Sequence, residues 1–134
     1  MKKLVLLLSL LFVFNSCSTD DGDNFRFELL PVESVEIPNE FTLGETYEIT
    51  IRYYRPSTCH AFNSFYYEKN LNTRTIAVES IVFEQDGCEA LESVLVEKKL
   101  NFHVTNNGSY IFKFWQGANE YGEDVFLEYE IPVI

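Results

Sequence analysis

Cysteine and histidine are the residue types in this chain best suited to nucleophilic or metal chemistry. The 134 residues contain three cysteines and two histidines, and Cys59 and His60 are adjacent. A cysteine nucleophile needs a histidine beside its thiolate, but neighbouring residues of a strand point to opposite faces of a sheet. A zinc site built from Cys59, His60, Cys88 and His103 would lack the close ligand spacings of structural zinc sites. The sequence therefore predicts no catalytic residue, no metal site and no cofactor.

Cys59 and Cys88 are instead predicted to form a disulfide bond. Outside the cytoplasm, an even pair of cysteines is most simply oxidised. The bond would close a loop of about 30 residues, which the chain-entropy model values at roughly 3–4 kcal/mol. It would hold the loop "STCHAFNSF" against the turn "QDGCEA".

The third cysteine, Cys17, follows an apolar leader. Lys2 and Lys3 precede the segment "LVLLLSLLFVF", which is shorter than the roughly 20 apolar residues of a membrane helix. A basic start, a short apolar stretch and small residues near a cleavage point are typical of a secretory signal peptide. We therefore expect residues 1–16 to be removed and the rest of the chain to be exported.

The junction at Cys17 resembles a bacterial lipobox. Ser16 supplies the small residue before the cysteine, whereas Phe14 and Asn15 stand where an aliphatic and a small residue are commoner. The resemblance implies that Cys17 is acylated, becomes the first residue and anchors the chain in a lipid bilayer, since two or more lipid chains give stable anchoring. Plain secretion, with cleavage after Ser18, is the alternative.

Acidic residues follow the cysteine at once. The segment "CSTDDGD" resembles the lipoprotein export signal of Bacteroidota, which implies transport to the outer face of the outer membrane. Residues 17–24 also have the composition of a solvated tether. We expect a lipid-anchored protein of the outer membrane that is exposed at the cell surface. A periplasm-facing or a secreted protein is the alternative.

Length and charge limit the mature protein to one acidic domain. Removal of residues 1–16 leaves 118 residues with eight basic and 21 acidic side chains, a net charge of −13. This size suits a single domain over residues 25–134. Nucleic acids attract clusters of Lys and Arg, so the charge argues against a nucleic-acid partner.

Alternating apolar and polar residues predict strands along most of this domain. The segment "TYEITIRY" points Tyr47, Ile49, Ile51 and Tyr53 to one face, and "VFLEYEIPVI" repeats the pattern at the end of the chain. "VESVEI" lies between two prolines and is typical of an edge strand. "RTIAVESIVF" changes phase before Ile81, which predicts a β-bulge. Seven or eight short strands without a long helix predict an all-β sandwich.

One motif indicates which kind of sandwich this is. The segment "NNGSYIF" resembles the strand corner Asp-x-Gly-x-Tyr-x-Cys of immunoglobulin-like domains, with Asn106, Gly108, Tyr110 and Phe112 at the four named positions. The resemblance implies an immunoglobulin-like antiparallel β-sandwich. It also implies a structural tyrosine corner, in which the Tyr110 hydroxyl bonds to the main chain near Gly108. Phe112 stands where antibody-type domains have a cysteine.

Three aromatic residues are candidates for contact with a ligand or partner. Each directly follows an aromatic residue that the alternation points into the core; the pairs are Tyr53–Tyr54, Tyr66–Tyr67 and Phe114–Trp115. The second members, Tyr54, Tyr67 and Trp115, are then expected to face outward. There they could stack on sugars or anchor a protein. The alternative is that they cover the sheet beneath a loop.

These features favour a non-catalytic binding or interaction module for an unknown protein or glycan. An accessory structural subunit of an envelope complex for uptake or secretion is the alternative. A small secreted hydrolase is a third reading, although the chain has no Gly-x-Ser-x-Gly or His-Glu-x-x-His motif.

Overall fold

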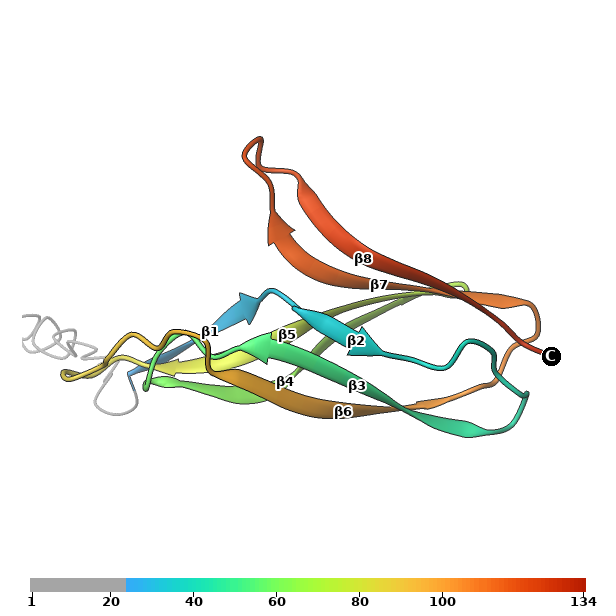
Figure 1. The fold of residues 1–134 in the computed structure, drawn as a ribbon, viewed down its shortest axis with the longest axis horizontal. Coiled ribbons are helices and arrows are strands. Elements are labelled where there is room, and N and C mark those ends of the chain that lie inside the picture. Colours follow the sequence, from blue (N-terminus) through green and yellow to red (C-terminus); the bar gives the residue numbers. More distant parts are fainter. Residues whose placement is uncertain (1–23) are drawn as a thin grey trace, which may run out of the picture.

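The computed structural model describes residues 24–134, which form two β-sheets packed face to face (Figure 1). The strands of this part of the chain are β1 (Phe25–Leu30), β2 (Ser34–Glu36), β3 (Thr46–Tyr54), β4 (His60–Asn70), β5 (Thr73–Phe83), β6 (Leu95–His103), β7 (Ser109–Ala118) and β8 (Asp124–Pro132). The predicted all-β sandwich is confirmed, whereas its immunoglobulin-like character stays a prediction. The predicted signal peptide and Cys17 lie outside the described residues, as does all of the tether except Asn24.

The five-stranded sheet is built around β5. β4 pairs with the whole of β5, from His60–Val82 to Asn70–Thr73. β7 pairs with the first part of β5, and β1 pairs with the last part. β1 and β7 therefore follow one another along the same edge of β5, and β8 pairs with β7. The β5–β7 pairing is parallel, which departs from the antiparallel arrangement that the sequence predicts.

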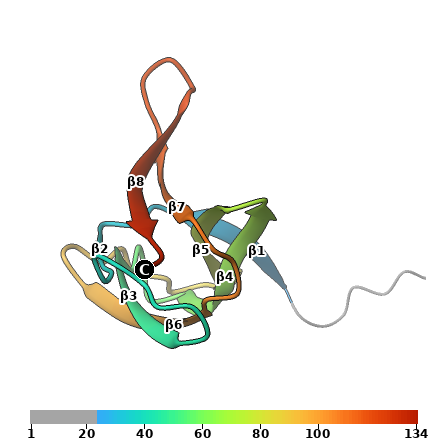
Figure 2. The same ribbon diagram turned by 90° about the vertical axis from the view of Figure 1, so that its right-hand side faces the viewer.

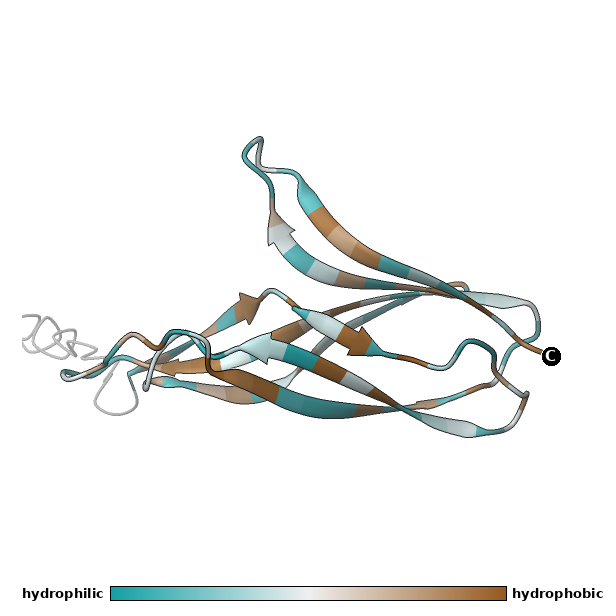
Figure 3. Cartoon of the chain, in the orientation of Figure 1, coloured by the Kyte–Doolittle hydropathy of each residue, from teal (hydrophilic) through white to brown (hydrophobic). Residues whose placement is uncertain are grey.

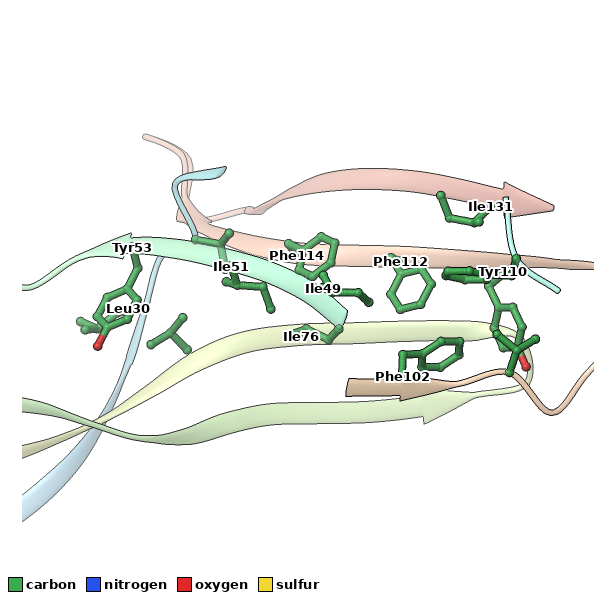
Figure 4. Close-up of a cluster of buried hydrophobic side chains, with 14 residues drawn as sticks. Leu30, Ile49, Ile51, Tyr53, Ile76, Phe102, Tyr110, Phe112, Phe114 and Ile131 are labelled. Atoms are coloured by element: carbon green, nitrogen blue, oxygen red, sulfur yellow. The ribbon is translucent and has the colours of Figure 1, made fainter. Parts of the chain in front are cut away.

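The three-stranded sheet has the order β2-β3-β6 and covers one face of the larger sheet. β2 is an edge strand, as its flanking prolines predict. Inward side chains of both sheets meet in one core (Figure 4). Ile49 and Ile51 of β3 face Ile76 of β5 and Phe112 and Phe114 of β7, and all five are fully buried. Each such side chain contributes about 1.5–3 kcal/mol by leaving water.

The predicted β-bulge is wrong for β5 and occurs in β4 instead. The register between these strands shifts between Phe62 and Ser64. Along β5 the alternation continues without a break, and Ser80 takes an inward position where its hydroxyl donates to the Ala61 carbonyl oxygen at 3.0 Å. Ile81 therefore points outward. The apparent change of phase in the sequence reflects a strand with apolar residues on both faces.

The bulge also reverses the predicted orientations of Tyr66 and Tyr67. Phe62 and Phe65 both pack against the core, because the extra residue between them restores the inward direction. Tyr67 consequently lies on the inward side of β4, opposite the core residue Ile76, and Tyr66 lies on the outward side opposite Ala77. The prediction that Tyr66 is a core residue is wrong: 40% of its surface is exposed.

Candidate binding face

The outer face of the five-stranded sheet carries large apolar side chains. Leu30, Ile76 and Phe112 are buried and mark the inward side of their strands, so alternate residues point outward. We call the outward aromatic residues of the five strands, together with Leu29, the aromatic face; they are Phe25, Phe27 and Leu29 of β1, Tyr66 of β4, Phe83 of β5, Trp115 of β7 and Phe126 of β8.

The β1 end of the aromatic face is the more exposed. Phe25 lies opposite Phe83 in the strand register, and the rings of Phe25 and Phe27 meet edge to face with centroids 5.6 Å apart. Phe27 exposes 55% of its surface. An antiparallel sheet with one face on the core ordinarily turns polar residues to water on the other. A set of neighbouring exposed apolar residues on that face marks a site of interaction.

The β7–β8 hairpin stands away from the rest of the molecule (Figures 1 and 2). The register of its two strands shifts between Trp115 and Ala118, and Gly117 has a φ of 94°. A β-bulge bends the strand that contains it, and glycine adopts positive φ without steric cost. Figure 3 shows apolar bands on the part of β8 that rises with this bend.

A groove of about 500 Å³ lies where the hairpin meets the outer face of the sheet. We call it the hairpin groove, and all five strands line it; the residues are Leu29, Tyr66, Glu68, Thr75, Ala77, Lys113, Trp115, Asp124 and Phe126. Leu29 also belongs to the apolar row of β1. The groove is therefore continuous with the exposed phenylalanines.

Polar contacts within the hairpin groove hold its aromatic rings in place. The Trp115 indole Nε1 donates to Asp124 Oδ1 at 3.0 Å, and the Tyr66 hydroxyl donates to Glu68 Oε2 at 2.8 Å. This hydrogen bond to Glu68 raises the pKa of Tyr66 above its ordinary value. Lys113 Nζ lies 4.4 Å from the centroid of the Phe126 ring, within the range of a cation–π contact.

Both ends of the hairpin are fixed by hydrogen bonds. At its base, the Val32 amide donates to the Trp115 carbonyl oxygen at 2.8 Å, and Gln116 Nε2 donates to the Val32 carbonyl oxygen at 3.2 Å. At its tip, Asn119 Oδ1 accepts from the amides of Tyr121 and Glu123. Asparagine stabilises turns through such contacts. The groove is thus formed by a braced hairpin.

The structure does not bring the three predicted contact residues together. Trp115 lies in the hairpin groove, as its predicted outward position allows. Tyr54 is 46% exposed but lies on the outer face of the three-stranded sheet, and Tyr67 is 43% exposed on the inward side of β4. Sequence reasoning missed Tyr66 because it misplaced the bulge. It also missed the outward direction of Phe25 and Phe27, since Leu29 and Leu30 give β1 an apolar residue on either face.

The predicted disulfide bond between Cys59 and Cys88 is confirmed, and their Cα atoms are 5.5 Å apart. Main-chain contacts strengthen the same junction: the Thr58 amide donates to the Glu89 carbonyl oxygen at 2.9 Å, and the Leu91 amide donates to the Pro56 carbonyl oxygen. The bond ties the two loops as predicted. Because both sulfur atoms are used in the bond, neither cysteine has a free thiol for a zinc site or a nucleophile.

Tyr110 makes the main-chain hydrogen bonds that the strand-corner motif implies. Its side chain is fully buried, and its hydroxyl oxygen accepts from the amides of Thr105 at 3.1 Å and Asn106 at 2.8 Å. Gly108 lies in the same turn with a φ of 90°. The Arg74 guanidinium is stacked 5.1 Å from the centre of the Tyr110 ring. This corner fixes the turn that leads from β6 into β7.

A serine, a histidine and a glutamate form a hydrogen-bonded chain beside the disulfide. Ser57 Oγ is 2.7 Å from His60 Nδ1, and His60 Nε2 is 3.2 Å from Glu28 Oε2. Ser57 Oγ also accepts a hydrogen bond from the Cys59 amide at 3.1 Å. Sequence reasoning combined His60 only with cysteines and with His103, and it missed this chain because Glu28 is distant in the sequence. The chain joins the start of β4 to β1.

Among residues 24–134, no three His, Cys, Asp or Glu side chains gather into a set that could hold a metal ion. That part of the chain also lacks an apolar helix of membrane-spanning length. The sequence matches no protein-family model, no curated protein and no solved structure.

Proposed function

We propose that this protein is a non-catalytic binding module that is anchored by lipid to the outer membrane and exposed at the cell surface. The observation that carries the binding role is the aromatic face. Phe25, Phe27 and Tyr66 each expose 40% or more of their surface on one side of one sheet. The anchoring part of the proposal rests on the lipobox-like residues around Cys17.

The composition of the aromatic face favours contact with a partner over a structural role within the chain. Aromatic side chains are enriched at binding sites, where they bury a large area with few rotatable bonds. The apolar residues are contributed by every strand of the sheet and surround a groove with fixed polar groups. A concave apolar site with a few placed polar groups is the usual form of a ligand site.

Capture of partners from intact cells tests the binding role. The full chain and the variant Phe27→Ser/Tyr66→Ser are expressed in the native host and crosslinked at the surface. We expect the wild-type protein to capture a protein or glycan that the double variant does not. Leu71→Asn is the matched control, because Leu71 exposes 85% of its surface in the β4–β5 turn, outside the aromatic face. Equal capture by all three proteins would contradict the proposal.

An accessory subunit of an envelope complex is the alternative within the same cellular location. It predicts stoichiometric co-purification with an outer-membrane assembly, in place of an external ligand. The two functions differ in the crosslinked product: a fixed set of membrane proteins supports the subunit, and an exogenous ligand supports the binding module.

A small hydrolase is a second candidate because of the Ser57–His60–Glu28 chain, whose members follow the logic of a serine triad. Ser57 Oγ already accepts the Cys59 amide, and that amide is therefore not free to act as an oxyanion donor. Ester hydrolysis by the purified chain, abolished in Ser57→Ala and retained in Thr58→Ala, would support this activity. Equal background rates in all three would support the non-catalytic reading.

A further inference from the structure

We propose that the hairpin groove binds a neutral sugar unit of a glycan, with Trp115 as the stacking platform. This inference rests on the proposed binding function and specifies the chemical class of its ligand. Three observations carry it: the aromatic rings of the groove, the mixture of charges among them, and the bracing that forms the groove in advance.

The aromatic rings suit the apolar face of a pyranose ring. Tyr66, Trp115 and Phe126 come from three different strands and line one cavity. A sugar presents a patch of C–H groups on one side of its ring and hydroxyls around the edge. Aromatic faces carry partial negative charge and attract the slightly positive C–H groups. Hydroxyls then need polar partners nearby, because a buried hydroxyl without a hydrogen bond is costly.

The polar groups of the groove include both hydrogen-bond acceptors and a hydrogen-bond donor. Glu68 and Asp124 offer carboxylate oxygens that accept hydrogen bonds, and Lys113 offers an ammonium that donates them. A sugar hydroxyl both donates and accepts, so a ring with several hydroxyls can use all three groups. A purely apolar ligand would remove water from these three charged groups and offer them no new hydrogen bond.

The same charges argue against charged ligands. An anionic ligand would meet the carboxylates of Glu68 and Asp124 within a protein whose formal net charge is −11. A cationic ligand would find the cation–π position over Phe126 already taken by Lys113, 4.4 Å from the ring centroid. Like charges at close range repel one another and disfavour a partner. A neutral polyhydroxylated ligand avoids both conflicts.

The groove is prepared for a ligand of this size. Its volume of about 500 Å³ falls within the range of roughly 300–1,000 Å³ typical of small-molecule sites. Asp124 fixes the Trp115 indole and Glu68 fixes the Tyr66 phenol through their hydrogen bonds. Rings that are already oriented lose little freedom on binding.

Intrinsic fluorescence tests the inference directly, because Trp115 is the single tryptophan of the chain. The full chain carrying Cys17→Ala is purified and titrated with neutral gluco-, manno-, galacto- and xylo-oligosaccharides. We expect at least one of them to change the Trp115 emission saturably and to protect the indole from quenching by acrylamide. Uronic-acid oligosaccharides and a lysine-rich peptide, the charged probes, should have no such effect.

Variants separate stacking from a general loss of structure. On immobilised oligosaccharide, Trp115→Ala should weaken binding by roughly ten-fold or more, since it removes the platform, and Trp115→Phe should retain most of it. Tyr54→Ala is the matched control and should bind as the parent does, because Tyr54 lies on the outer face of the other sheet. Urea midpoints of all variants confirm that each is folded.

The inference is overturned if no neutral oligosaccharide alters the Trp115 signal, if a charged probe alters it saturably, or if Trp115→Ala binds the sugar as well as Tyr54→Ala does. The result also separates this inference from the proposed function. If cells capture a protein in a way that requires Phe27 and Tyr66 but no sugar binds, the sugar site is wrong and the proposed binding function is retained. If neither partner capture nor sugar binding is observed, the proposed function and the sugar site are both contradicted.

Discussion

At the scale of single residues, the hydroxyl of Tyr110 is a polar atom placed in the core with two defined partners. Replacement by phenylalanine would leave the amides of Thr105 and Asn106 without their acceptor in a part-buried corner. We expect Tyr110→Phe to lower the free energy of unfolding by about 1–3 kcal/mol, because two main-chain donors lose an acceptor that water replaces poorly there. Urea denaturation measures this value.

Tyr47→Phe is the matched control for this prediction. The Tyr47 hydroxyl also accepts one main-chain amide, from Thr42 at 2.8 Å, but this contact is exposed, so water can replace it. Its loss should cost less than about 1 kcal/mol. Equal costs for the two variants would contradict the structural role that the motif assigns to Tyr110.

Glu28 gives the molecule a pH dependence at the β1–β4 junction. Burial on its own would raise the pKa of Glu28, but the hydrogen bonds and charges of Arg26 and His60 outweigh it and hold the pKa below its usual value. A carboxyl whose pKa is lower in the folded state stabilises the protein above its unfolded pKa, about 4.3 for glutamate. This contribution disappears as the pH falls through the folded-state value.

The variant Glu28→Gln should therefore melt at a lower temperature than the parent at pH 7, and the difference should shrink below about pH 4.3 and vanish only as the pH falls through the lower folded-state pKa of Glu28. The Glu28 side chain is 35% exposed, so solvent screening limits the difference at pH 7 to less than about 1 kcal/mol. Thermal melts followed by circular dichroism between pH 3 and 7 provide the measurement. A gap of constant size across this range would show that Glu28 acts through its shape and not through its charge.

At the scale of the elements, alternation predicts a strand well when only one of its faces is apolar. In β3 the residues Tyr47, Ile49, Ile51 and Tyr53 all point to the core side as predicted. In the last strand, four of the five residues predicted to point inward pack on the core, namely Leu127, Tyr129, Ile131 and Val133, whereas Val125 is 39% exposed. Both strands have charged residues on the other side, so the sequence pattern is compatible with only one choice of inward face.

Alternation fails where both faces are apolar or where a strand contains a bulge. In β5, Ile81 points outward and the buried Ser80 points inward. Hydropathy alone would predict the opposite orientation for both residues. In β4, the register shift between Phe62 and Ser64 reverses every later side chain. The candidate site depends on these two strands and on β1. Trp115 could therefore be predicted from the sequence, and the groove around it could not.

The bend of the β7–β8 hairpin leads to a prediction at the same scale. Gly117 has a φ of 94°, and an added Cβ would lie 3.6 Å from Pro31 Cγ, at ordinary contact distance. The cost of Gly117→Ala should thus come from the backbone conformation, about 1–2 kcal/mol. Because Gly117 lies in the bulge beside Trp115, the strain should also change the Trp115 emission spectrum.

Gly44→Ala is the control for the hairpin variant. Gly44 has a φ of 89° and no atom within 4 Å of an added Cβ, so its backbone cost should be similar. Its turn lies between β2 and β3, away from the groove. Both variants should lose comparable stability in urea, and only Gly117→Ala should alter the tryptophan emission. Identical spectra for the two would show that the bulge does not shape the groove.

At the scale of the whole molecule, the proposed function separates the domain that would bind a partner from the N-terminal segment that would attach it to the membrane. The two sheets of the domain enclose one core between them, and the five-stranded sheet exposes apolar groups on its outer face. The acidic segment after Cys17 has no basic residue up to Asn24 and cannot bind anionic lipid headgroups by charge. In the function proposed here, attachment to the bilayer therefore comes from acyl chains on Cys17.

Replacement of Cys17 by alanine tests whether this residue attaches the protein to the membrane. Each buried methylene of an acyl chain contributes about 0.8 kcal/mol, and several chains make attachment nearly permanent. We expect the parent protein to sediment with outer membranes and to be cleaved when intact cells are treated with protease, and Cys17→Ala to be found in a soluble fraction.

The soluble variant should melt at the same temperature as the domain released from cells, because Cys17 precedes β1 and takes no part in the Cys59–Cys88 bond. Cys59→Ala is the control and should lower the melting temperature without changing the fraction in which the protein is found. If the Cys17→Ala protein still sediments with membranes, the sulfur is not the anchor, and the surface location proposed for this module loses its support.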